Sequence, residues 1–260
     1  MLRFVLLSAL AIAGPSNGYA WGIEGHQIVA DIAEAYLTPA ARKQVDALLN
    51  GARMRDVANY ADEIRPFRRE TARWHYVNVA PGEKTYSPER DCQDIPGQGD
   101  CVIAAIARTL QPLGISSTPL EKKALELKYL IHFLADAHQP FHAVTEGKGG
   151  NEIRVRFLGA SSNLHRVWDA DLIKRIGQSP QEIAARLIER WKRESSQQPN
   201  RVWGHAVDWT MQSREIGLSA LVANGAELDQ EYCERFIPVV EEQLMLAGAR
   251  LAGLINQQFR

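Results

Sequence analysis

Two histidine–aspartate pairs in the sequence have a spacing that suits metal chelation. His132 and Asp136 form the first pair, and His165 and Asp169 form the second. Both pairs lie in segments whose apolar residues recur every three or four positions, which indicates helix. Residues four apart on a helix share a face, with their Cβ atoms about 6 Å apart. One such pair could equally be a surface ion pair or a buried histidine, but two in one chain favour chelation.

Further potential ligands accompany these pairs. Pro140 must end or kink the helix that carries His132, and this turns His142 toward a different ion. Upstream, Asp62 and His75 stand among residues expected to be buried. Imidazole nitrogens and carboxylate oxygens together suit zinc.

The first twenty residues have the pattern of a secretory signal peptide. Arg3 precedes an apolar run at 4–14, and small and polar residues then lead to a cleavage point after Ala20. The run is too short to span a bilayer, and no membrane anchor is expected. Cleavage would make Trp21 the N-terminus, where its amine and carbonyl could chelate an ion with His26 in reach. A retained anchor helix and a merely flexible end are the alternatives.

The charge balance limits how a polyanionic ligand could be held. Once the signal is removed, 29 Lys and Arg stand against 31 Asp and Glu, a net charge of −2. Such a chain lacks the wide positive surface of proteins that coat duplex DNA, so an anion must be held by local groups or metal ions. The charge balance therefore favours an enzyme over a protein that coats DNA. The signal peptide predicts a secreted or periplasmic location.

The three cysteines allow one disulfide. Cys92 and Cys101 bracket a turn-rich loop that would benefit from a covalent link, which leaves Cys233 free. Three reduced thiols are the alternative.

The apolar periodicity predicts an all-α protein, with residues 21–260 forming a single compact multi-helix domain. Capping hydroxyls precede first-turn prolines at Thr38, Thr118 and Ser179. Helices are predicted near 24–37, 38–50, 55–65, 101–113, 119–139, 163–176, 179–195, 206–223 and 229–254. Alternating apolar and arginine residues at 152–158 predict a small half-exposed β-hairpin rather than a core sheet.

Several motifs occur in one order along the chain. They are Trp-Gly-x-x-Gly-His at 21–26, Ala-Asp-x-Ile-Arg at 61–65, Trp-His-Tyr at 74–76, His-x-x-x-Asp-x-His-Gln-Pro-x-His at 132–142, Gly-Gly-Asn at 149–151 and His-x-x-x-Asp at 165–169. In these motifs the chain resembles the zinc-dependent single-strand nuclease and 3′-nucleotidase family, which has the phospholipase C/nuclease-like fold. The resemblance implies hydrolysis of single-stranded DNA and RNA to 5′-nucleotides, and 3′-nucleotidase activity.

The resemblance also implies a site with three zinc ions. One zinc would be bound by Asp62, His75, His132 and Asp136, a second by Trp21 and His26 with Asp136 bridging, and the third by His142, His165 and Asp169. His138 and His205 match no ligand position, so structural roles are expected for them.

The expected substrate contacts follow from the same resemblance. Arg65 would bind phosphate, and Gly149, Gly150 and Asn151 would contact the nucleoside. Asn78 stands where the family often has an acidic residue.

The hypothesised nucleophile is a hydroxide that bridges the two zinc ions that share Asp136. Asp62 would orient this hydroxide, and Arg65 would offset charge on the phosphate.

The protein is expected to be a monomer. A zinc-dependent phospholipase C is the alternative enzyme, although that group has glutamate at the position of Asp169. A non-catalytic zinc-storage protein is the alternative from another class.

Overall fold

The computed structural model describes residues 21–260, so the predicted signal peptide lies outside the described residues. Helices make up most of this part of the chain, as predicted. The longer ones are α1 (Ile23–Ala35), α2 (Pro39–Leu48), α5 (Val102–Gly114), α6 (Leu120–Asp136), α9 (Pro180–Ser195), α10 (Ala206–Ser219) and α11 (Gln230–Gln258). The shorter ones are η1 (Met54–Val57), α3 (Tyr60–Ile64), η2 (Arg69–His75), α4 (Pro88–Asp91), η3 (Pro140–His142), α7 (Leu164–Arg166), η4 (Val167–Asp171), α8 (Leu172–Arg175) and η5 (Pro199–Val202).

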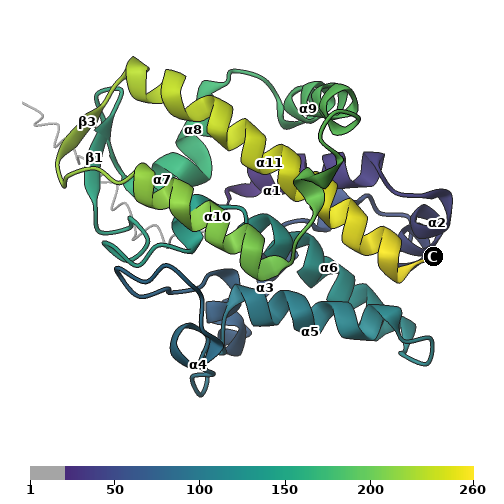
Figure 1. Cartoon of the computed structure of the whole chain (residues 1–260). Helices are drawn as coiled ribbons and strands as arrows, with labels where there is room; N and C mark the ends of the chain where they lie inside the picture. The colour runs from purple at the N-terminus through teal and green to yellow at the C-terminus, as the bar shows by residue number, and fades with distance from the viewer. Residues whose placement is uncertain (1–20) are drawn as a thin grey trace, which may run out of the picture.

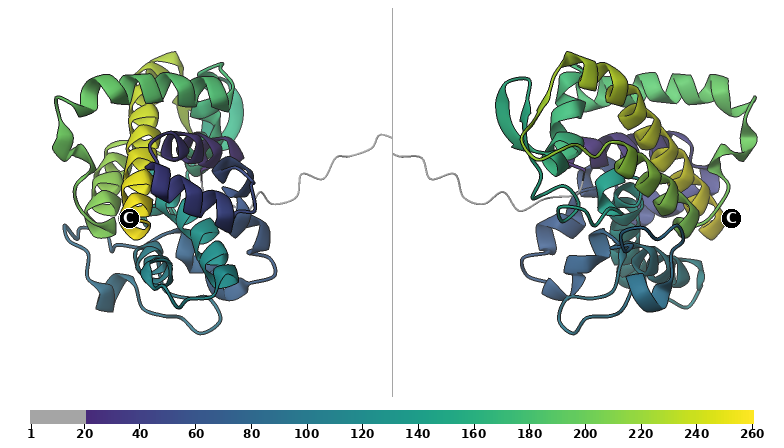
Figure 2. Two further views of the ribbon diagram at one scale, coloured as in Figure 1. Left: turned by 90° about the vertical axis from the view of Figure 1, so that its right-hand side faces the viewer. Right: turned by 60° about the vertical axis from the view of Figure 1, so that its left-hand side comes forward.

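Helix α11 crosses the length of the molecule and packs against α1 (Figure 1). The two helices approach closely at Gly248, where an added Cβ would lie 2.5 Å from the Cβ of Ile32. Helix α1 also packs against α6 and α9, and α5 packs along α6. Figure 2 shows α9 on the opposite side of the molecule from α5. The second half of α6 is therefore surrounded, and every residue from Tyr129 to Asp136 is buried. Within the described residues no helix is both long enough and apolar enough to cross a membrane.

Two of the three capping signals act as predicted. The Thr38 side chain accepts a hydrogen bond from the amide of Ala41, and Ser179 forms a reciprocal capping box with Glu182. Helix α6 instead starts at Leu120 after Pro119, without a side-chain cap.

The predicted hairpin is present and carries a third strand. β1 (Arg154–Phe157) pairs antiparallel with β2 (Ala160–Asn163), and β3 (Ala226–Leu228) lies parallel to β1 on its other edge. Leu158 and Gly159 form the turn, both with positive φ, as two-residue hairpins require. The sequence did not reveal β3, because three residues are too few to show an alternating pattern.

Two predicted helices are divided in the structure, and three others end three or four residues from the predicted position. Residues 55–65 form two short helices, η1 and α3, and residues 163–176 form α7, the π-helical turn η4 and α8. The helix predicted at 119–139 ends at Asp136, four residues before Pro140. The helices predicted at 206–223 and 229–254 end at Ser219 and Gln258. The two divided segments carry Asp62 and the His165–Asp169 pair, where an irregular backbone can direct side chains to a common point.

The disulfide joins Cys92 to Cys101 as predicted, and Cys233 is free and buried. The loop that it closes packs on the segment leading to His75. Gly99 lies so close to this segment that an added Cβ would be 2.3 Å from the carbonyl oxygen of Glu70. The amide of Val102 then donates to the carbonyl of Tyr76, 3.0 Å away. The disulfide therefore constrains the backbone on both sides of His75.

Replacing both Cys92 and Cys101 with serine should lower the free energy of unfolding by roughly 2–3 kcal/mol, because the unfolded chain loses a short covalent loop. Urea unfolding of wild type and variant measures the difference. Reductant should destabilise a Cys233→Ala control, which keeps the disulfide, and should leave the double variant unchanged. Equal reductant sensitivity of both proteins would contradict the prediction.

Candidate metal centre

Three groups of buried histidines and aspartates lie near the centre of the molecule. In each group the potential ligand atoms lie within 4.8 Å of one another, and no member residue is more than 6% exposed. The groups are His26, Asp62 and His132; His75, His132 and Asp136; and His142, His165 and Asp169. All eight side chains proposed as ligands from the sequence thus meet in three groups that could hold metal ions.

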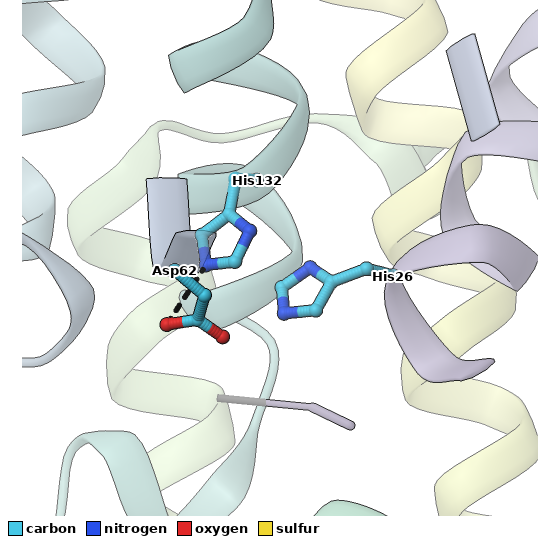
Figure 3. A group of neighbouring side chains, drawn as sticks. All are labelled: His26, Asp62 and His132. Carbon is cyan, nitrogen blue, oxygen red and sulfur yellow. Dashed lines mark ion pairs between the residues drawn. The ribbon is translucent and has the colours of Figure 1, made fainter. Parts of the chain in front are cut away.

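The first two groups share His132 and form one continuous cluster. Figure 3 shows His26 from α1, Asp62 from α3 and His132 from α6 facing one another. The His26 and His132 rings stack with centroids 3.9 Å apart, and Asp62 Oδ1 lies 3.9 Å from His132 Nε2. The sequence placed His26 with a different ion from His132, whereas the structure places them in ring contact.

Asp136 directs its two oxygens to different histidines. Its Oδ2 lies 3.0 Å from His75 Nδ1 and 3.3 Å from His132 Nε2. Its Oδ1 lies 3.6 Å from both His26 Nε2 and His142 Nδ1. This divergence is what a carboxylate that bridges two ions requires.

Backbone carbonyls orient three of the histidines. The Nδ1 of His132 is 2.8 Å from the carbonyl oxygen of Ala58, and the Nδ1 of His142 is 2.7 Å from that of His75. The Nδ1 of His165 lies 2.6 Å from the carbonyl oxygen of Gly149. When Nδ1–H donates to a carbonyl, the lone pair stays on Nε2, the nitrogen that then binds a metal.

Burial and mutual charge set the protonation of the cluster. Burial lowers the pKa of His26 well below its usual value and that of His142 to about 3, so both stay neutral. Burial opposes ionisation of Asp136, yet the neighbouring His132 holds its pKa well below the ordinary value. For His132 itself burial lowers the pKa, but Asp136 and Asp62 outweigh it and raise the pKa to about 9. A proton on His132 thus supplies a positive charge that a bound metal ion would replace.

Several ligand atoms in the cluster are buried without a hydrogen-bond partner among residues 21–260. They are both ring nitrogens of His26, Nε2 of His75, Oδ1 of Asp62 and Oδ1 of Asp136. Leaving such atoms unpaired is costly. Cation binding would satisfy them together, so this donor set fits metal ions.

The third group is supported by Gln139, a residue of the 132–142 motif for which the sequence predicted no role. Burial raises the pKa of Asp169 well above its usual value, and a hydrogen bond from the Gln139 amide to Oδ1 opposes this rise. His165 Nε2 lies 3.2 Å from Asp169 Oδ2, and the His142 and His165 rings stack. Gln139 is fully buried and would be recognised from sequence only by its place between the two ligand segments.

Trp21 is anchored beside both parts of the centre. Its indole Nε1 donates to the carbonyl of Ala135, 2.9 Å away, and the amide of Gly22 donates to the carbonyl of Asp169. Gly25 makes room for it, because an added Cβ would lie 2.8 Å from the Trp21 Cβ. The glycines of the 21–26 motif therefore serve close packing, not the mobility of a flexible end.

A cavity of about 470 Å³ opens beside the metal ligands. Its lining includes four predicted substrate contacts, Arg65, Asn78, Gly149 and Asn151, together with His75, His142 and His165. Gly150 does not line it, because it is buried against Phe141 and the His165 backbone. Gly149 and Gly150 have φ values of 62° and 79°, and this turn presents the carbonyl that orients His165.

The two remaining histidines lie outside the ligand groups. His138 Nδ1 donates to the carbonyl of Leu134 and its Nε2 accepts from Arg250. Burial lowers the pKa of His138 to about 3, so it is the neutral structural histidine that was expected. His205 is exposed at the start of α10.

The fold and these ligand groups define a helical protein with a buried, multi-ligand metal centre. The S1/P1 Nuclease family model matches residues 21–260, and the chain belongs to that family. Endonuclease 4 of Arabidopsis thaliana is 32% identical over 289 residues, covering 99% of this chain and 96% of the relative. Nuclease P1 of Penicillium citrinum is 28% identical, covering 91% and 97%. Nuclease S1 of Aspergillus oryzae is 26% identical, covering 98% of both.

Substituting Gly25 with alanine should displace Trp21 and lower both metal content and stability, the latter by about 1–3 kcal/mol as for other overpacked sites. Gly253→Ala is the matched control, since it also lies in a helix but its added Cβ would meet no atom within 4 Å. The control should be neutral or slightly stabilising. Metal analysis and urea unfolding of the processed proteins provide the comparison, and identical behaviour of the two variants would refute the packing role.

Proposed function

We propose that the mature chain is a zinc-dependent phosphodiesterase that hydrolyses single-stranded nucleic acid to 5′-nucleotides and removes 3′-phosphates from nucleotides. One observation carries this proposal: ligand histidines of two metal groups and the guanidinium-bearing Arg65 line the same cavity. A phosphate in that cavity would meet metal ligands on one side and a cation on the other. The S1/P1 nuclease relatives support the same activity.

The proposed centre holds three zinc ions in the sets given by the sequence. His75, His132, Asp62 and Asp136 would bind one, and His142, His165 and Asp169 another, as carboxylate and imidazole ligands suit zinc. The third would be held by His26, Asp136 and the main chain of Trp21. The diverging oxygens of Asp136 and the unpaired nitrogens of His26 support this division.

When bound, zinc supplies hydroxide as nucleophile near neutral pH and neutralises charge on the phosphoryl oxygens and leaving group. Asp62 and Asp136, both almost fully buried, would fix the direction of attack. Arg65 Nη1 lies 3.8 Å from Asp62 Oδ1. A guanidinium held there can donate to two phosphate oxygens and offset charge as the phosphorus–oxygen bond breaks.

The cavity wall would select a nucleotide. Asn78 and Asn151 offer amide groups that can both donate to and accept from a base edge. Tyr76 also lines the cavity and follows His75 directly, which places an aromatic ring where a base can stack. The ring was not identified as a contact from the sequence.

Export would complete the centre. Cleavage after Ala20 and a secreted or periplasmic location are proposed from the leader pattern, with residues 21–260 acting as one monomeric domain. The indole anchor of Trp21 supports the cleavage point, because it holds the new N-terminal residue beside Asp136.

Asp136→Ala should remove zinc and abolish hydrolysis more completely than any other ligand substitution, because one carboxylate would serve two ions. Zinc per chain and turnover of a single-stranded oligonucleotide are measured on the same sample. Asp46→Ala, which changes an exposed carboxylate on α2, is the control and should match wild type. An Asp136→Ala protein with three zinc ions and full activity would overturn the assignment.

Arg65→Ala should lower kcat/KM for a 3′-nucleotide by about 10- to 100-fold, the range expected for losing a charge-assisted hydrogen bond to phosphate. Zinc content should stay unchanged, and Arg65→Lys should recover part of the loss. Arg69→Ala is the control, because Arg69 is exposed and does not line the cavity. Loss of zinc in Arg65→Ala would show that Arg65 acts by positioning Asp62 instead.

The phospholipase alternative is tested by assaying single-stranded DNA and phosphatidylcholine vesicles side by side. We expect hydrolysis of the nucleic acid alone. Hydrolysis of the lipid alone would show that the protein is a phospholipase C and not a nuclease. Zinc binding without either activity would favour a storage role.

A further inference from the structure

The solvent-facing side of the small sheet carries a second hollow that the proposed active site does not use. It measures about 450 Å³, and its lining consists of Val155, Gly225, three arginines and three small polar residues. They are Arg154, Arg156 and Arg166 with Ser161, Ser162 and Asn163. We refer to it as the arginine hollow.

Strand register explains why four of these groups meet, while Arg166 is supplied by α7. Arg154 pairs with Asn163 and Arg156 pairs with Ser161 across β1 and β2. Directly paired residues and residues two apart on a strand point to the same face. The opposite face carries Val155 and Phe157, which are buried. The arginine–apolar alternation that predicted the hairpin thus puts two guanidinium groups on one open surface.

Acidic groups neutralise this surface only in part. Arg156 pairs with Glu227 at 2.9 Å, and Arg166 lies 3.7 Å from Asp171, with both arginine side chains more than half exposed. Among residues 21–260 the Arg154 guanidinium has no ion-pair or hydrogen-bond partner. Exposed ion pairs are weak, so all three guanidinium groups can turn to an anion. In a chain with no overall positive charge, such a cluster marks a local anion site.

The arginine hollow and the active-site cavity share one piece of backbone. Arg166 directly follows His165, and Arg154 lies three residues after Asn151, about 10 Å along an extended chain. The amide of Leu164 donates to the carbonyl of Ile153, so the two segments lie against each other. His165 and Asn151 line the active-site cavity, while Arg166 and Arg154 line the arginine hollow. A strand leaving the active site over this shared backbone would next meet the three arginines.

We propose that the arginine hollow binds the phosphodiester backbone of a single-stranded nucleic acid, beyond the nucleotide that occupies the active site. This inference rests on the proposed function and extends it to substrate length. One guanidinium group can donate hydrogen bonds to two oxygens of the same phosphate. The hydroxyl groups of Ser161 and Ser162 and the amide of Asn163 can add neutral hydrogen bonds. A mononucleotide gains nothing from the hollow, whereas an oligonucleotide does.

The test compares a long and a short substrate in an Arg154→Gln/Arg166→Gln variant of the zinc-loaded processed enzyme. For a single strand of about ten nucleotides, within the usual size of single-strand sites, KM should rise about tenfold while kcat holds. The dependence of log KM on log salt should weaken by roughly 0.7 for each lost phosphate contact. Kinetics with a 3′-mononucleotide should match wild type.

Arg186→Gln/Arg193→Gln is the matched control. It removes the same charge from α9, which lies well away from the strands (Figure 1). If the control raises the oligonucleotide KM equally, only net charge matters and the site is refuted. Unchanged KM and salt dependence in the first variant also refute it. Equal losses with the mononucleotide would show damage to the active site instead. If wild type cleaves neither substrate, the proposed function itself fails.

Discussion

Three carboxylates buried together, Asp62, Asp136 and Asp169, set the main physical demand on this structure. Burial disfavours their charge, and Asp169 shows the effect as a raised pKa. Five buried imidazoles surround them, and four of the unpaired atoms belong to His26, Asp62 and Asp136. Only cations at the centre satisfy all these groups at once. Metal ions bound there would therefore add to the stability of the helices that enclose the centre.

The architecture meets this demand by combining two long helices, α1 and α6, with several short segments. Helix α6 supplies His132 and Asp136 from a buried regular face, as its periodicity indicates. His26 comes from α1, and the remaining ligands come from short elements: α3, η2, η3 and the turn from α7 into η4. Each of these can direct a single side chain without imposing a helical face, and carbonyls such as those of Ala58 and Gly149 then fix the ring orientation.

This division explains what the sequence could predict. Ligand types and their four-residue spacing were readable because they depend on local helix geometry, and the Cys92–Cys101 pairing followed from loop composition. The contact between His26 and His132 was not readable, since it depends on how α1 crosses α6. The carbonyl that orients His165 was missed as well, because Gly149 was interpreted only as a nucleoside contact. Strand β3 gave no signal, because it is three residues long and pairs with residues 71 positions earlier in the chain, such as Ala226 with Val155.

Under the proposed ligand set, the position of Trp21 would make removal of the leader part of the chemistry. Its ring is completely buried and donates a hydrogen bond to the carbonyl of Ala135, next to Asp136. The proposed ligand set requires the main-chain nitrogen of Trp21 to be a free amine and not a peptide nitrogen. A precursor still inside the cell would carry a blocked donor and an incomplete centre. A leader trimmed one residue too early or too late would leave the same defect. The cell that makes such an enzyme would thereby keep its own nucleic acids out of reach until the protein has crossed the membrane.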